Sequence, residues 1–212
     1  FRRVLFRSDF TLKDVDLSPL QSAASQALLL QIAKYPAMLT AAAKDFVTHA
    51  GQLKVIQGDV TDHQAVEEVI AAGHEAVILG AAITAGPERE AADPETILQV
   101  NLLAQTPILV AARSSGAKRI INLSSAAAYG VSAFRNDLLD EETHCDPVSL
   151  YAITKFASEK VAARLAGLWQ QEIISVRLSA VFGPWERTND VRDTPSPQAQ
   201  ILAAMQEGRE AV

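Results

Sequence analysis

Glycine is missing from the first quarter of the 212-residue sequence, because the ten glycines begin only at Gly51. Glycine has no Cβ, so it supplies the tight turns in which backbone N–H groups closely approach a bound phosphate. A glycine-rich phosphate-binding turn is therefore excluded before residue 51. The phosphate loop Gly-x-x-x-x-Gly-Lys is absent from the whole sequence.

Cysteine occurs once, as Cys145, so the chain cannot form an internal disulfide. Disulfides mark oxidising compartments, and a cytoplasmic location is the expectation for a chain without them. Cys145 lies in a predicted loop and belongs to no recognisable thiol–base pair, which argues against a nucleophilic role. The histidines show no metal-ligand spacing, so we expect no metal site; they are His49, His63, His74 and His144.

Positive charge is not in excess, because 19 Lys and Arg against 25 Asp and Glu give 19 − 25 = −6. Nucleic-acid binding needs concentrated positive charge, so we expect no nucleic-acid partner. The apolar run 76–83 is shorter than the ~20 residues of a membrane span, so no membrane partner is expected. The basic start 1–8 lacks the apolar stretch of a secretory signal, and we interpret it as a scar or the cut edge of a longer protein.

Strand and helix patterns alternate regularly from Leu53 onward, and 49 % of the residues are apolar, enough for a real core. Asp62 and Asp93 are placed as helix N-caps, and Gly73 and Gly116 as helix ends. Alternation of this kind predicts an α/β fold with a parallel sheet. The predicted strands are 53–57, 76–82, 119–124 and 172–178, and the predicted helices are 62–72, 93–116, 150–168 and one from Pro195 or Pro197.

The first 50 residues follow a different pattern, with helical stretches starting at Ser18-Pro19 and near Ala37. We therefore divide the chain into three parts. An atypical helical segment covers 1–50, a core covers 51–194, and 195–212 begins a further portion.

Tyr151 and Lys155 are four residues apart, which places a phenol and an ammonium on one face of a helix. A phenol has a pKa near ~10, and a neighbouring cation lowers that pKa and favours the phenolate. The alternative interpretation is an ordinary surface pair.

Ser124-Ser125 directly follows an apolar predicted strand and precedes Ala126-Ala-Ala-Tyr129-Gly130. In open α/β sheets, ligands bind at the carboxyl ends of the strands. A hydroxyl at that place can hydrogen-bond a substrate oxygen, whereas the plainer alternative is a polar strand end. The Tyr151/Lys155 pair favours the functional interpretation.

These motifs together resemble the extended short-chain dehydrogenase/reductases, the NAD-dependent epimerase/dehydratase family. The resemblance rests on Ile-Asn-Leu-Ser-Ser-Ala-Ala-Ala-Tyr-Gly, on Tyr-x-x-x-Lys some twenty residues later, and on Val-Arg-Leu-Ser-Ala-Val-Phe-Gly-Pro. It covers about residues 53–190. It implies a Rossmann-like doubly wound parallel sheet with flanking helices, whose N-terminal βαβ unit is incomplete or atypical here.

The resemblance also implies roles for individual residues. Tyr151 would be the catalytic acid/base, with Lys155 lowering its pKa and holding the nicotinamide ribose of NAD or NADP. Ser125 would orient the substrate oxygen. Further cofactor contacts would come from Asp59, Val60, Ala81, Ala82, Asn101 and Leu178, and further substrate contacts from Ala126 and Arg187.

Departures from the family pattern shape the expected function. The glycine finger that meets the pyrophosphate is absent, so we expect this chain to bind a dinucleotide weakly or not at all. Dehydratases of the family usually carry an Asp-Glu pair where this chain has Ala126 and Ala127, which disfavours elimination. Ala180 replaces an Asn that is frequent in members acting on nucleotide sugars.

The leading hypothesis is an NAD(P)-dependent oxidoreductase acting on a sugar, sugar acid or related polyol. A nucleotide-sugar 4-epimerase is the alternative within the same chemistry. A non-catalytic dinucleotide-sensing module is the alternative from another class, and the retained Tyr151/Lys155 pair argues against it. The expected partner is a carbohydrate-like small molecule, and the family resemblance implies a homodimer through the helix carrying Tyr151 and its preceding neighbour.

Overall fold

A three-stranded parallel sheet forms the centre of the computed structural model, which describes residues 56, 58–181 and 195–209. The strands are β1 (Ala76–Leu79), β2 (Arg119–Ser125) and β3 (Glu172–Leu178), in the order β1-β2-β3. The predicted α/β class with a parallel sheet is confirmed. The predicted features of 1–50, nearly all of the predicted strand 53–57, and Arg187 lie outside the described residues.

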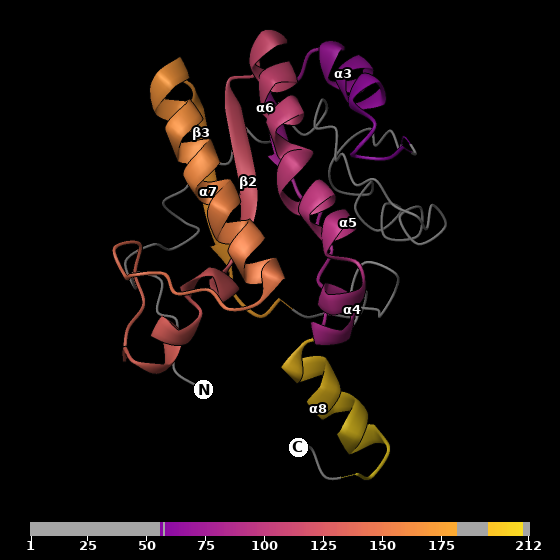
Figure 1. The fold of residues 1–212 in the computed structure, drawn as a ribbon, viewed down its shortest axis with the longest axis vertical. Coiled ribbons are helices and arrows are strands. Elements are labelled where there is room, and N and C mark those ends of the chain that lie inside the picture. The colour runs from indigo at the N-terminus through magenta and orange to yellow at the C-terminus, as the bar shows by residue number, and fades with distance from the viewer. Residues whose placement is uncertain (1–55, 57, 182–194, 210–212) are drawn as a thin grey trace, which may run out of the picture.

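Helices pack on this sheet and connect its strands (Figure 1). α6 packs on β1 and lies beside α3, and α7 packs on β2 and β3. None of the helices in the described ranges has the length and apolarity that a membrane crossing requires. The helices are α3 (His63–Ala71), α4 (Pro87–Ala92), α5 (Pro94–Leu98), α6 (Gln105–Ser114), α7 (Leu150–Trp169) and α8 (Pro197–Gln206), with the π-helical turn η1 (Gln99–Leu103) and the 3₁₀ turns η2 (Ala126–Tyr129) and η3 (Val131–Phe134).

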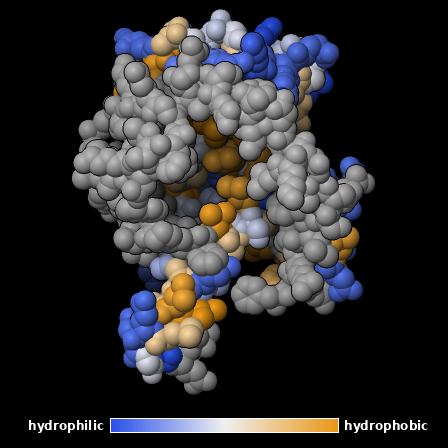
Figure 2. All heavy atoms as spheres, turned by 180° about the vertical axis from the view of Figure 1, so that it is seen from behind, coloured by the Kyte–Doolittle hydropathy of each residue, from blue (hydrophilic) through white to orange (hydrophobic). Residues whose placement is uncertain are grey.

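The apolar core lies between β1, β2 and the helices α3 and α6. Alternate residues of a strand point to opposite faces of the sheet, so Val77, Leu79 and Ile120 share the buried helix-facing side. Ile78 and Ile121 on the other side are apolar too, as expected for strands of a doubly wound sheet. Figure 2 shows hydrophobic side chains gathered in the middle of the view from behind.

Local capping explains why several predicted helix ends are confirmed. The Asp62 side chain accepts a hydrogen bond from the Ala65 N–H at 3.1 Å and begins α3, and Gly73 follows with φ +82°. Ser149 caps α7 in the same way, with its Oγ 3.2 Å from the Ala152 nitrogen. These signals lie within three residues of the helix end, so they act without help from the rest of the fold.

The segment after β1 differs from the prediction of a strand to residue 82 and one helix over 93–116. β1 pairs with β2 only as far as Leu79, and the chain then leaves the sheet. α4 precedes Asp93, which ends α4 and caps α5 through a bond from the Thr96 N–H. Pro94 interrupts the helical hydrogen bonding there, and the turn η1 separates α5 from α6.

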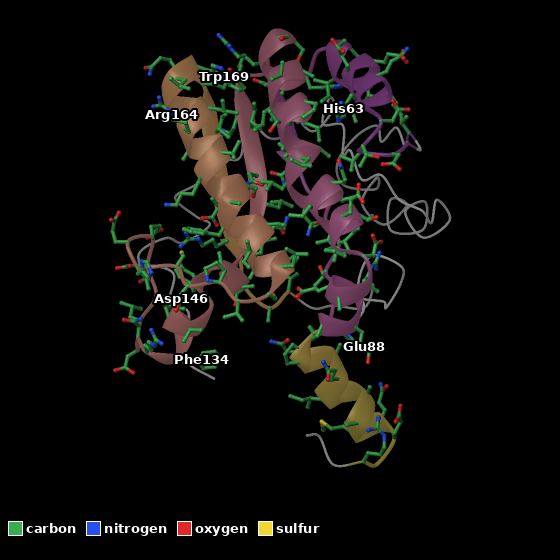
Figure 3. The ribbon with its side chains drawn as sticks, viewed as in Figure 1. His63, Glu88, Phe134, Asp146, Arg164 and Trp169 are labelled. Carbon is green, nitrogen blue, oxygen red and sulfur yellow. The ribbon has the colours of Figure 1, made fainter. Side chains whose placement is uncertain are left out.

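The predicted polar loop 130–148 is partly ordered by local structure. η3 begins next to Gly130, which forms a bridge with Asp146 at φ +53°. A Cβ on Gly130 would overlap the Asp146 carbonyl, so this position requires glycine. Figure 3 shows Phe134 and Asp146 on this segment, which lies near the N-terminal start of α7 and far from Trp169 at its other end.

Candidate active site

Ser125 lies at the carboxyl end of β2, in register with Leu178 at the end of β3. Its Oγ accepts a hydrogen bond from the Ala127 N–H at 3.1 Å and thereby caps the turn η2, which begins with Ala126. This bond fixes the hydroxyl oxygen and leaves its proton available to a ligand. The structure thus brings Ser125, Ala126 and Leu178 together at one edge of the sheet.

Tyr151 and Lys155 lie on the first two turns of α7, as the four-residue spacing predicts. The Lys155 Nζ lies 5.9 Å from the Tyr151 ring centroid and donates a 2.7 Å hydrogen bond to the Leu123 carbonyl. That carbonyl belongs to β2, two residues before Ser125. Lys155 is only 3 % exposed, and burial lowers its pKa to about 8.

Asn101 is fully buried in η1 and connects α7 with the segment after β1. Its Oδ1 accepts from the Ile83 N–H at 2.7 Å, and its Nδ2 donates to the Ile83 carbonyl at 3.0 Å. The same Nδ2 donates to Thr154 Oγ1 at 3.3 Å, and Thr154 in turn donates to the Tyr151 carbonyl at 2.8 Å. Asn101 therefore acts on the site through Ile83 and Thr154, and its contact with a cofactor stays a prediction.

Four of the predicted cofactor-contact residues gather around the end of β1. Val60 and Ala81 line one small, mostly apolar cavity together with Gly80. Asp59 is exposed beside them, and two 2.8 Å bonds from Thr61 to its Oδ1 lower its pKa. Ala82 follows directly and is half-buried.

A largely buried ion pair that the sequence reasoning missed lies between β3 and α7. The Arg177 guanidinium binds both carboxylate oxygens of Glu159, with Nε 2.9 Å from Oε1 and Nη2 2.7 Å from Oε2. Ser124 Oγ donates to the same Oε1 at 2.5 Å, and Arg177 lies 4.5 Å from the Tyr129 ring centroid. The carboxylate raises the pKa of Arg177, so the guanidinium stays charged. A signal existed, since Glu159 continues the four-residue spacing of Tyr151 and Lys155 along α7.

The residues present fit the ribose-bearing part of a dinucleotide. Lys155 keeps two of its three N–H donors beyond the bond to Leu123, and the exposed Asp59 carboxylate offers acceptor oxygens.

Comparison with known families agrees with this arrangement. Residues 24–210 match the model of the NAD dependent epimerase/dehydratase family. The chain belongs to this family. The match begins at residue 24, whereas the resemblance described from the sequence begins at about residue 53.

Individual relatives of the epimerase/dehydratase family are distant. The chain is 26 % identical over 137 residues to UDP-glucuronate 4-epimerase 6 of Arabidopsis thaliana, covering 64 % of this chain and 30 % of the relative. The structure of RMD from Pseudomonas aeruginosa complexed with NADPH has a TM-score of 0.65 at 22 % identity, covering 84 % of this chain and 62 % of that one. A UDP-N-acetylglucosamine 4-epimerase from Methanobrevibacter ruminantium, solved with UDP-N-acetylmuramic acid, has a TM-score of 0.64 at 23 % identity, covering 76 % and 50 %. The chain thus spans about a third of the curated relative and half or more of the solved ones.

One short match is of another kind. Over 39 residues, 18 % of this chain, the sequence is 64 % identical to arginine–tRNA ligase of Delftia acidovorans. The match covers 7 % of that protein, so it supports no statement about aminoacylation.

Proposed function

We propose that the full-length protein is a nucleotide-sugar 4-epimerase that works by nicotinamide-dependent hydride transfer. The observation that carries the proposal is the Lys155 bond to the Leu123 carbonyl, which joins the helix of Tyr151 and Lys155 to the strand that ends at Ser125. Strand ends of this kind hold ligands in open α/β sheets.

Each of these side chains has a distinct task. Ser125 donates a hydrogen bond to the sugar oxygen and orients it, and the Tyr151 phenol exchanges a proton with that oxygen. The ammonium of Lys155 stabilises negative charge on the phenol oxygen. A bound NAD or NADP supplies the hydride acceptor. Lys155 would hold this cofactor together with Asp59, Val60, Ala81, Ala82 and Leu178.

The relatives support a nucleotide-linked sugar as the substrate class. The proteins that this chain resembles include a UDP-glucuronate 4-epimerase and a UDP-N-acetylglucosamine 4-epimerase. Ala126 and Ala127 leave η2 without carboxylates, which supports epimerisation or simple hydride transfer over elimination.

The test uses the full-length gene product with UDP-glucuronate and UDP-N-acetylglucosamine, and follows the C4 epimer by proton NMR. We expect Tyr151→Phe to lower kcat by roughly 10²- to 10⁴-fold, because proton transfer is lost. Ser115→Ala, which removes a hydroxyl at the far end of α6, is the matched control and should keep the parent kcat.

Other outcomes decide between the alternatives. Accumulation of reduced nicotinamide without an epimer would indicate a sugar oxidoreductase. Dinucleotide binding without turnover on any sugar nucleotide would indicate a sensing module.

We further propose a homodimer formed through α6 and α7, as the family resemblance implies. Exposed apolar side chains support it, with Val110 on α6 and Ile153 on α7. Sedimentation velocity should show a dimer for the parent and a monomer for Ile153→Asp.

A further inference from the structure

Glu90 contacts the main chain of the catalytic tyrosine from a different helix. Its Oε1 accepts a hydrogen bond from the Tyr151 N–H at 3.3 Å, across 61 residues of sequence. Glu90 lies on α4, which follows the loop after β1, and both partners are half-buried.

The start of α7 requires a hydrogen-bond acceptor from outside the helix. The first N–H groups of a helix have no partner within the helix, and this end carries partial positive charge. The first turn of α7, residues 150–153, contains no acidic residue. The Ser149 side chain accepts from the Ala152 N–H and its carbonyl from the Ile153 N–H, so neither serves Tyr151. Glu90 supplies both the missing acceptor and a negative charge from α4.

A second connection ties the same turn to the same loop. Thr154 donates to the Tyr151 carbonyl, Asn101 donates to Thr154, and Asn101 binds both backbone groups of Ile83. The loop between Ile83 and Glu90 is therefore attached at both of its ends to the backbone of Tyr151. With only one attachment, the turn could rotate against the strand ends.

We propose that Glu90 is a positioning residue that fixes Tyr151 relative to the strand ends, and this role rests on the function proposed above. A displacement of a reacting group by about 1 Å can lower a rate by roughly 100-fold. Glu90 acts through the backbone of Tyr151, so its loss changes the catalytic rate and leaves substrate affinity unaltered.

The first experiment measures the hydrogen bond itself in the 212-residue chain. Amide proton shift and hydrogen exchange of Tyr151 are recorded by NMR for the parent and three variants, Glu90→Ala, Glu90→Gln and Glu88→Ala. Glu88 lies on the same short helix and is exposed (Figure 3), so its removal matches the charge change. We expect an upfield amide shift and faster exchange in Glu90→Ala, and parent values in Glu88→Ala. An unchanged Tyr151 amide in Glu90→Ala would overturn the proposal.

The second experiment measures turnover of the same variants in the full-length protein. We expect Glu90→Ala to lower kcat roughly 10- to 100-fold with KM unchanged, and Glu90→Gln, which keeps an acceptor oxygen, to recover most of the loss. A raised KM with an unchanged kcat would overturn the positioning role. If the parent itself shows no turnover, the proposed function fails, while the amide measurement still decides whether Glu90 holds Tyr151.

Discussion

On the helix-covered face of the sheet, the side near β1 and the side near β3 are built from different chemistry. On the β1 side, α3 and α6 pack on the strands through apolar side chains such as Ile70 and Leu109, which are almost fully buried and meet the buried Ile120 of β2. On the β3 side, the N-terminal half of α7 meets β2 and β3 through a polar layer. Its buried members are Asn122, Ser124, Thr154, Lys155, Ser158 and Glu159.

The difference separates stability from placement. Apolar contacts are non-directional and stabilise the fold in proportion to the area that they bury. Hydrogen bonds and ion pairs need defined geometry, so the polar layer fixes the position of α7 on the strands. The candidate catalytic residues lie on the polar side, where position matters most.

The largest effect should follow from breaking the buried ion pair of the polar side. Glu159→Ala leaves the Arg177 guanidinium without its partner, in a pair whose side chains are 9 % and 18 % exposed. We expect the free energy of unfolding to fall by about 3–5 kcal/mol, measured by urea denaturation of the 212-residue chain.

The double variant Glu159→Leu with Arg177→Met is the control, because it removes both charges at similar volume. It should regain most of the lost stability. A loss below about 1 kcal/mol in Glu159→Ala would show that this pair behaves like an exposed one.

A slightly smaller effect is expected on the apolar side. Ile70→Ala removes a fully buried side chain of α3 and should lower the free energy of unfolding by about 2–4 kcal/mol. The Tyr151 amide shift should stay at its parent value, since the polar side is untouched. A shifted Tyr151 amide would show that the two sides are not independent.

The polar side should also respond to pH through Lys155. Its pKa is lowered from 10.5 to about 8 by burial, so between these two values the unfolded chain binds more protons than the folded one. Stability contributed by this group therefore rises with pH through that window, by about 1–2 kcal/mol from pH 7 to pH 9.5.

The comparison of the parent with Lys155→Met isolates this contribution from other groups that titrate there. Turnover should move in the opposite direction and fall above pH 8, because the proposed chemistry uses the charged ammonium. Equal stability profiles for the parent and Lys155→Met would contradict the assignment.

The smallest effect is expected at the sheet surface. The Lys118 Nζ lies 3.0 Å from the Glu75 Oε1, a distance similar to that in the Arg177–Glu159 pair. The Lys118 and Glu75 side chains, however, are 78 % and 42 % exposed. Lys118→Ala should therefore change the free energy of unfolding by less than about 1 kcal/mol, and 0.5 M salt should remove the difference. A loss as large as that of Glu159→Ala would mean that burial does not distinguish the pairs.

Elements with local signals could be predicted from the sequence. α3, β3 and the start of α7 have their expected bounds because a cap, a glycine or an apolar pattern lies within each element. The four-residue spacing likewise placed Tyr151 and Lys155 on one face of α7. These features depend on neighbours in the chain and not on the final packing.

Features that depend on distant partners could not be predicted in this way. The early end of β1 and the turn η1 accompany bonds between Asn101 and Ile83, which are 18 residues apart. The contacts of Glu159 with Arg177 and of Glu90 with Tyr151 span 18 and 61 residues. Nothing near Glu90 in the sequence indicates which amide it will meet.

The turn η1 has a consequence for how the gene can vary. A π-helical turn corresponds to one extra residue in a helix, and Asn101 is the third of its five residues. Deleting a single codon there would restore a regular helix and rotate the preceding residues by about 100° relative to α6. Asn101 would then turn away from Ile83 and Thr154. This stretch should therefore tolerate substitutions of its exposed residues far better than insertions or deletions.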